Sequence, residues 1–290
     1  MRTRKCLVRT PARSYPENML MHYKVGFIGV GNMAQAIIKG LVEAKVVAPH
    51  HIFAANRTPG KLQKAVDLWG VQPLAANEQV IDQCDIIVLA MKPQDLSSAI
   101  DPLVGLFNEG QIVISLAAGI QVHQLRKKLP QCRVVRVMPN TPTVINHGVI
   151  GYLTGKEDDA LDTVVEDLFT PLGVVLKVQD EEQLEALMIS CSSGPGFIFE
   201  MMMYFQDWIE ERGFEPDVAR KMVVETFLGA AKLAAVNPDQ SLEDLQSKVT
   251  SKKGVTAAGL ESMREFEIER ALRYSFEKAA LRNQELAKQG

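Results

Sequence analysis

The sequence contains few of the residues that bind metals or form disulfides. Its 290 residues include five histidines and four cysteines, and His50 and His51 are adjacent rather than one helical turn apart. No His-Glu-x-x-His motif and no paired-cysteine motif occurs, so we expect no metal site. The cysteines lie far apart along the chain, which is typical of reduced thiols in a cytosolic protein. They are Cys6, Cys84, Cys132 and Cys191.

Long apolar runs and an excess of positive charge are also lacking. The most apolar segment, residues 197–209, is interrupted by Glu200, Gln206 and Asp207. No run reaches the ~18 to 20 residues that a transmembrane helix needs, and we therefore expect no membrane span. The formal net charge is −3 and the pI is about 6.0. Such a chain has no overall basic field to hold nucleic acid or an anionic membrane surface.

Residues 1–21 lack the apolar core of a secretory signal. They carry mainly basic charges, with Glu17 as their only acid. We interpret this extension as a disordered tail or as a start codon assigned too early, since Met19 and Met21 directly precede the first expected strand. An organelle-targeting segment is the alternative. A cytoplasmic location is the expectation.

What the sequence does contain is a strand, a glycine turn and a helix in succession. Residues 25–28 form an apolar run, and residues 36–41 have helical spacing. Between them, Gly29 permits a tight bend, Gly31 leaves room for a pyrophosphate, and Ala34 allows close packing of helix on strand. The helix N-terminus adds unpaired N–H groups. A small-residue turn without a ligand is the alternative, but this context favours dinucleotide binding.

The turn after the second expected strand indicates which dinucleotide is bound. An NAD-binding fold usually ends this strand on an acid that accepts from the ribose hydroxyls, and no acid occurs between Phe53 and Ala65. Arg57 stands there instead, between Asn56 and Thr58, and these side chains suit a 2′-phosphate. The pattern favours NADPH, with NADH possible. A solvated loop arginine is the alternative.

Apolar runs of strand length alternate with helical segments up to about residue 180. The expected strands lie within residues 25–28, 51–56, 71–74, 85–90, 111–119, 133–138, 148–153 and 174–178, and the expected helices within 36–41, 61–69, 95–106, 121–129 and 158–168. This alternation predicts an α/β fold of Rossmann type with a mostly parallel sheet. Ligands bind at the carboxyl ends of such strands, so residues 90–93 should face the cofactor. Lys92 contacts the nicotinamide ribose or is a solvated charge.

The remaining chain is expected to be helical. Candidate helices cover residues 181–190, 195–212, 216–235, 241–247, 256–263 and 266–288. The helix at 195–212 is apolar almost all round and must be covered on every side. We infer that helices of a second subunit cover it, giving an obligate homodimer or a larger oligomer built from dimers. A core helix within one subunit is the alternative. The predicted domains are residues 22–180 and 181–290.

A polar loop at residues 249–256 precedes one of these helices. Gly254 just before a helix start offers free N–H groups to an anion such as a substrate carboxylate, and Lys252 and Lys253 add attraction. Judged from these residues alone, a solvated connector is the better interpretation.

Several segments taken together resemble pyrroline-5-carboxylate reductase, the enzyme of the last step of proline synthesis. They occur in the family's order and span residues 24–290. The matching segments are residues 27–34, 90–93, 115–119, 138–142, 193–195, 229–232 and 249–256.

The resemblance implies NAD(P)H-dependent reduction of a cyclic C=N bond and an all-helical C-terminal dimerisation domain. It places a small-molecule substrate, through its carboxylate, on the main-chain N–H groups of Gly254, Val255 and Thr256. It also implies the cofactor residues, to which we add Arg57 and Thr58 from the turn described above. The implied residues are Ile28, Gly29, Val30, Gly31, Asn32, Met33, Asn56, Asn77, Ala90, Met91, Lys92, Pro93, Leu116, Ala117 and Ala118.

Two loops depart from the family pattern. The family usually has glycine where Lys253 stands, and Ser-Gly-Ser-Gly-Pro-Ala where this chain has residues 191–196. If the backbone needs a positive φ at Lys253, the side chain costs roughly 1 kcal/mol relative to glycine. Main-chain contacts to a carboxylate survive such a change.

The expected reaction needs no strong acid, because a cyclic imine is partly protonated near neutral pH. Thr256 is the candidate for a hydrogen bond to the ring nitrogen, and alignment of the bound partners would supply most of the acceleration. One alternative is a β-hydroxyacid dehydrogenase or imine reductase, for which Glu200 and Asp207 are candidate catalytic residues. The other is a non-catalytic NADPH-binding regulator.

Overall fold

The computed structural model describes residues 19–154 and 157–289. These residues form two compact units, one made of Gly194–Ala279 and the other of the remaining described residues. The boundary near residue 180 that the sequence suggests stays a prediction. Of the predicted extension, residues 1–18 lie outside the described residues. Met19–His22 form a short 3₁₀ helix, and Leu20 is fully buried in the core of the first unit, so the folded part begins before the first strand.

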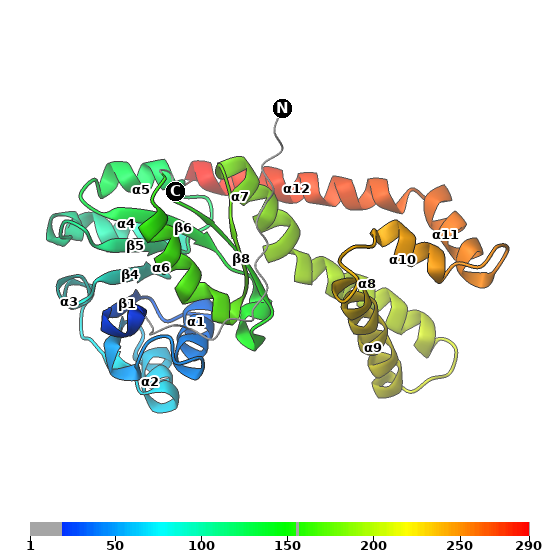
Figure 1. The fold of residues 1–290 in the computed structure, drawn as a ribbon, viewed down its shortest axis with the longest axis horizontal. Coiled ribbons are helices and arrows are strands. Elements are labelled where there is room, and N and C mark those ends of the chain that lie inside the picture. Colours follow the sequence, from blue (N-terminus) through cyan, green and yellow to red (C-terminus); the bar gives the residue numbers. More distant parts are fainter. Residues whose placement is uncertain (1–18, 155–156, 290) are drawn as a thin grey trace. The chain divides into compact units, whose positions relative to one another are not determined.

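The first unit is built on one sheet (Figure 1). The strand order is β3-β2-β1-β4-β5-β6-β7-β8. Neighbouring strands are parallel except β6 and β7, which are antiparallel. The predicted mostly parallel Rossmann-type sheet is therefore confirmed. The strands are β1 Val25–Ile28, β2 Ile52–Ala55, β3 Gln72–Pro73, β4 Ile86–Leu89, β5 Ile112–Ser115, β6 Arg133–Met138, β7 Gly148–Leu153 and β8 Gly173–Lys177.

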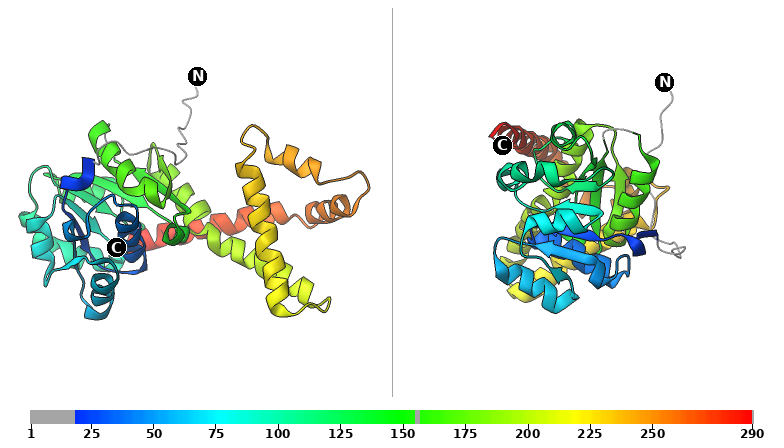
Figure 2. Two further views of the ribbon diagram at one scale, coloured as in Figure 1. Left: turned by 60° about the horizontal axis from the view of Figure 1, so that its bottom comes forward. Right: turned by 90° about the vertical axis from the view of Figure 1, so that its left-hand side faces the viewer.

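Helices cover both faces of this sheet (Figure 2). The two faces bury alternate residues of each strand, as a parallel sheet requires. In β4, Ile86 and Val88 pack with α1 and α6, whereas Ile87 and Leu89 pack with α3, α4, α5 and α7. The helices are α1 Asn32–Glu43, α2 Pro59–Trp69, α3 Asn77–Gln83, α4 Pro93–Ile100, α5 Val122–Lys128, α6 Asp159–Phe169 and α7 Glu181–Leu187.

Two helical segments differ from the expectation. The helix expected over residues 95–106 is α4 followed by a 3₁₀ helix, Asp101–Leu106, because Pro102 has no N–H to continue the α-helical ladder. The helix expected over residues 181–190 ends as α7 and continues as a single π-helical turn, Met188–Ser192. A π-turn leaves backbone carbonyls displaced from the regular ladder and often occurs at functional positions.

The second unit contains only helices among its described residues. They are α8 Gly194–Glu210, α9 Pro216–Ala235, α10 Leu242–Lys248, α11 Val255–Glu265 and the first part of α12 Ile268–Gln289. Prolines occupy the first turns of α8 and α9 as expected. Ser241 and Asp244 form a reciprocal capping box at α10. The predicted succession of helices is confirmed.

The apolar surface of α8 stays uncovered within the single chain. Gly194 is its only buried residue among those described. One internal contact is the edge-to-face pair of Phe205 with Phe227 of α9. The alternative that α8 is a core helix of one subunit is therefore wrong. The large exposed apolar side chains of α8 are Ile198, Phe199, Met201, Met203, Tyr204, Phe205 and Trp208.

One helical stretch corrects the expectation that no segment could span a membrane. Glu181–Glu210 is continuous through the π-turn, and it is long and apolar enough by length and composition alone. Between residues 186 and 209 the charged residues are Glu200 and Asp207, which are too few to exclude this stretch on that criterion. A helix that packs against another subunit meets the same criterion.

Candidate functional site

The glycine turn after β1 is fixed at its first position by the protein itself. Gly29 has φ +96°, a conformation that L-residues with a side chain rarely adopt. A Cβ there would also lie 3.1 Å from the carbonyl carbon and oxygen of Ala90. The Gly29 N–H donates to the Ala55 carbonyl at 2.9 Å. Glycine is thus required here whether or not a ligand binds.

Gly31 is different, because nothing in the described chain requires a glycine there. Its φ of −72° is ordinary, and a Cβ would meet no atom within 4 Å. Gly31 is the N-cap of α1, which has no side-chain cap among the described residues and no acid in its first turn. The open space therefore lies at a helix N-terminus whose N–H groups can bind an anion. These residues fit the pyrophosphate of a dinucleotide.

The turn after β2 contacts the glycine turn through Asn56. Its Oδ1 accepts a hydrogen bond from the Val30 N–H at 3.0 Å. Its Nδ2 donates to the Thr58 carbonyl at 2.6 Å and to Thr58 Oγ1 at 3.0 Å. The Asn56 amide thus holds the two turns together. Arg57, between these residues, is 86% exposed and lies 3.7 Å from the Asp95 carboxylate of α4.

The turns after β4 and β5 complete the same edge of the sheet. The Ala90 N–H donates to the Ile28 carbonyl and the Leu116 N–H to the Leu89 carbonyl, so the first turn begins in register with β1 and the second in register with β4. Ala117 is buried, and its N–H donates to Ser115 Oγ at 3.3 Å. Lys92 is the exposed N-cap of α4 and precedes Pro93.

The structure brings most of the predicted cofactor residues to one edge. Because β2, β1, β4 and β5 are consecutive in the sheet, the turns at residues 56–58, 28–33, 90–93 and 116–118 lie side by side at their carboxyl ends. Asn77 differs from them because it is the first residue of α3, after the edge strand β3. The sequence pattern did not indicate this short helix.

Asn140, in the turn after β6, is a buried polar residue for which no role was predicted. This side chain is 5% exposed. Its Oδ1 accepts from the Val149 N–H at 2.9 Å, and its Nδ2 donates to the Cys191 carbonyl at 3.0 Å, inside the π-turn. Ser192 Oγ also donates to the Pro139 carbonyl at 3.2 Å. An asparagine between two prolines was the available signal, but its partners are distant in sequence.

The predicted substrate turn belongs to the helical unit. Gly254 is the N-cap of α11, and α11 has no side-chain cap among the described residues. A Cβ on Gly254 would overlap Ser251 Oγ and lie 3.1 Å from the Ser251 carbonyl oxygen, so a larger residue there would require the Ser251 side chain to move. Thr256 is exposed, and Val255 is 93% exposed. The first-turn N–H groups of α11 are therefore accessible to a carboxylate.

Lys253 has φ +59°, which confirms the left-handed conformation that the loop pattern suggested. We expect Lys253→Gly to raise the free energy of unfolding by about 1 kcal/mol, because glycine adopts this conformation without steric strain. Urea unfolding of both proteins measures the change. Lys252→Gly is the matched control, since Lys252 is not at a positive φ, and it should lower stability. If both variants changed the free energy of unfolding equally and in the same direction, the strain assigned to Lys253 would be contradicted.

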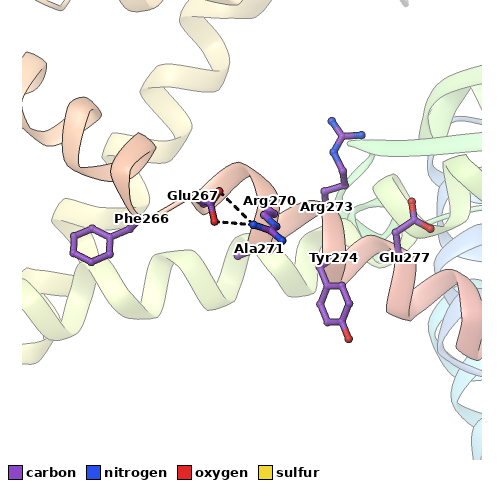
Figure 3. Close-up of a pocket in the computed structure, with 7 residues that line it drawn as sticks. All are labelled: Phe266, Glu267, Arg270, Ala271, Arg273, Tyr274 and Glu277. Atoms are coloured by element: carbon purple, nitrogen blue, oxygen red, sulfur yellow. Dashed lines mark hydrogen bonds and ion pairs between the residues drawn. The ribbon is translucent and has the colours of Figure 1, made fainter.

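Other chemistry-bearing groups lie apart from this site. Burial raises the pKa of the Cys84 thiol to about 12, with a further contribution from Asp85, and raises that of Cys132 to about 11. Both thiols therefore stay protonated at neutral pH. A hollow of about 470 Å³ lies along the start of α12 (Figure 3), and none of the predicted site residues lines it. Its Arg270 is paired with Glu267 at 3.1 Å.

Two family models match the chain. Residues 181–286 match the model described as pyrroline-5-carboxylate reductase dimerisation. Residues 24–119 match the model described as NADP oxidoreductase coenzyme F420-dependent. Together the two matches cover the helical unit and the glycine turn with its neighbouring strands.

Similar proteins extend these matches over most of the chain. Pyrroline-5-carboxylate reductase 1 of Bacillus spizizenii is 32% identical over 267 residues, which cover 91% of this chain and 89% of that protein. The structure of a pyrroline-5-carboxylate reductase from Coxiella burnetii is 31% identical, covers 91% of this chain and 98% of its own, and has a TM-score of 0.84. The Plasmodium falciparum pyrroline carboxylate reductase with NADP bound shares the fold at a TM-score of 0.82 and 22% identity, covering 92% and 99%.

Proposed function

Because this chain belongs to the pyrroline-5-carboxylate reductase family, we propose how its residues divide the work of that reaction. The protein is an oxidoreductase that reduces 1-pyrroline-5-carboxylate to L-proline with NADPH. In our proposal, the carboxyl edge of the sheet binds the cofactor and the turn before α11 binds the substrate. The space at Gly31 is the observation that carries the cofactor assignment, since it is open at an uncapped helix N-terminus.

The cofactor residues have distinct proposed roles. The first-turn N–H groups of α1, beginning at Asn32 and Met33, bind the pyrophosphate. Arg57 and Thr58 face the 2′-phosphate, and Asn56 keeps their turn in register with Val30 through the hydrogen bonds described above. The turns at residues 90–93 and 116–118 flank the remainder of the cofactor. When bound, NADPH supplies the hydride for the C=N bond.

The substrate role of the α11 turn is supported by its free N–H groups. Gly254, Val255 and Thr256 begin a helix without a competing side-chain cap or first-turn acid, and such a terminus stabilises a carboxylate. The Thr256 hydroxyl then hydrogen-bonds the ring nitrogen and orients the imine. A hydroxyl cannot act as a strong acid, and a partly protonated imine does not need one.

We expect Thr256→Ala to lower kcat about tenfold, which corresponds to one lost hydrogen bond in the transition state. NADPH affinity should stay unchanged because the cofactor residues are elsewhere. Steady-state kinetics and a binding titration measure the two quantities. Thr250→Ala is the control: its hydroxyl donates to the Gln246 carbonyl at 2.7 Å in the same loop, and its loss should leave kcat intact. Full turnover by Thr256→Ala would remove the residue from the mechanism.

One assay tests the activity against the alternatives. Purified protein is mixed with pyrroline-5-carboxylate and either NADPH or NADH, and the loss of reduced-nicotinamide absorbance is followed. We expect turnover with faster reaction on NADPH. Binding of NADPH without turnover would favour a regulator. The β-hydroxyacid dehydrogenase alternative finds little support in the structure, because its candidate Glu200 lies on the exposed surface of α8 and accepts a hydrogen bond from Tyr204.

We further propose that the protein is a homodimer, or a larger oligomer built from dimers. The match to a dimerisation model supports assembly of copies of this chain, and the exposed apolar side chains of α8 supply the surface. A second copy, rather than lipid, then covers α8, the part of Glu181–Glu210 that the sheet unit leaves exposed. The proposal includes no nucleic-acid partner. A cytoplasmic location is supported by the three cysteines among the described residues, Cys84, Cys132 and Cys191, which are all free thiols.

A further inference from the structure

One ion pair links two turns of the cofactor edge across the end of β1. Arg57 follows β2 and Asp95 lies in the first turn of α4, which follows β4. Because β2 and β4 flank β1 in the sheet, the pair joins the turns on either side of the glycine turn. The distance from Arg57 Nη1 to Asp95 Oδ1 is 3.7 Å, so the contact is charge attraction without a hydrogen bond.

The guanidinium is held loosely and has donors to spare. Arg57 is 86% exposed and the Asp95 side chain 43% exposed, and water screens a pair of this kind strongly. A phosphate dianion placed on Arg57 would make shorter, charge-assisted hydrogen bonds. The same dianion would be repelled by the Asp95 carboxylate, which lies within 4 Å of that guanidinium.

We propose that Asp95 is a specificity-determining residue that competes with the 2′-phosphate of NADP(H) for Arg57. This rests on the proposed role of Arg57 in binding that phosphate. The competition weakens NADPH and NADP⁺ binding and leaves NADH binding unchanged, because NADH has no phosphate at this position. Asp95 therefore limits the preference for NADPH and speeds release of NADP⁺ after each turnover.

Binding titrations of the full chain test this without relying on activity. Asp95→Asn should tighten NADPH and NADP⁺ about twofold to fivefold, the range expected for an exposed ion pair, and should leave the NADH dissociation constant unchanged. The NADP⁺ dissociation rate in stopped flow should fall correspondingly. Asp82→Asn is the matched control, because it neutralises an exposed carboxylate of α3. It should leave the affinities for NADPH, NADP⁺ and NADH unchanged.

The Arg57→Gln background separates the possible failures. There, NADPH binding should weaken, and adding Asp95→Asn should have no further effect. If Arg57→Gln leaves NADPH affinity unchanged, both the phosphate role of Arg57 and the competition are overturned. Suppose instead that Arg57→Gln weakens NADPH binding. The competition alone is then overturned if Asp95→Asn leaves NADPH affinity unchanged, weakens it, or tightens NADH binding by the same factor. Weaker NADPH binding would instead make Asp95 a residue that orients Arg57.

Discussion

Gly31→Ala is expected to lose about a hundredfold in NADPH affinity while folding normally. The added Cβ would meet no atom of the described residues within 4 Å, so the folded chain can accept it. In the proposed cofactor site, the same Cβ would occupy the space where the pyrophosphate approaches the N–H groups of α1, and losing about two charge-assisted hydrogen bonds amounts to ~3 kcal/mol. Calorimetric titration with NADPH and urea unfolding without cofactor measure the two effects.

Gly29→Ala is the matched control, because we expect it to lower the stability of the fold, whereas Gly31→Ala should lower NADPH affinity. The positive φ of Gly29 and the 3.1 Å approach to the Ala90 backbone should lower the free energy of unfolding by about 2 kcal/mol. Gly31→Ala should change stability by less than about 1 kcal/mol, the range for an N-cap substitution. NADPH binding by Gly31→Ala at the parent affinity would refute the pyrophosphate assignment.

The second large effect concerns the exposed surface of α8. Phe199 and Met203 are one turn apart, 61% and 50% exposed, and neither makes an aromatic contact among the described residues. We expect the double variant Phe199→Glu with Met203→Glu to be monomeric, because burying unpaired carboxylates in an apolar interface costs several kcal/mol. Light scattering across a concentration series measures the assembly. Turnover should fall at least about a hundredfold if the paired helices form the substrate site.

Two measurements separate loss of assembly from loss of folding. NADPH affinity should be retained by the double variant, because the cofactor edge belongs to the sheet unit. Lys127→Glu on the exposed part of α5 controls for an added negative charge and should leave assembly unchanged. A double variant that stays dimeric with full activity would show that this face of α8 is not the interface.

Most of the fold was predictable because its signals are local. The buried strands β1, β4, β5 and β6 are short apolar runs that end in small or turn-forming residues, and the observed bounds agree with them. The prolines at the starts of α8 and α9 and the capping box of α10 are equally local. The helix α3 gave no such signal, because only Val80 and Ile81 of its residues are buried and two apolar positions define no period.

The site was predictable in its residue types but not in its contacts. The sequence indicated Asn56 as a polar residue beside the cofactor, yet its amide is occupied with Val30 and Thr58. The hydrogen bonds of Asn140 and the ion pair of Arg57 with Asp95 join residues 9 to 51 positions apart. Such pairs depend on the order of the strands in the sheet, which local patterns do not specify.

The helices α8 and α9 bury few residues, and this affects how the chain folds. The buried residues are Gly194, Ala219 and Val223. A helix pair with so little interior of its own gains little free energy by forming alone. On transfer from denaturant, the sheet unit should form in a unimolecular phase, and the helices should become protected from hydrogen exchange only in a later, bimolecular phase. That later rate should rise in proportion to chain concentration.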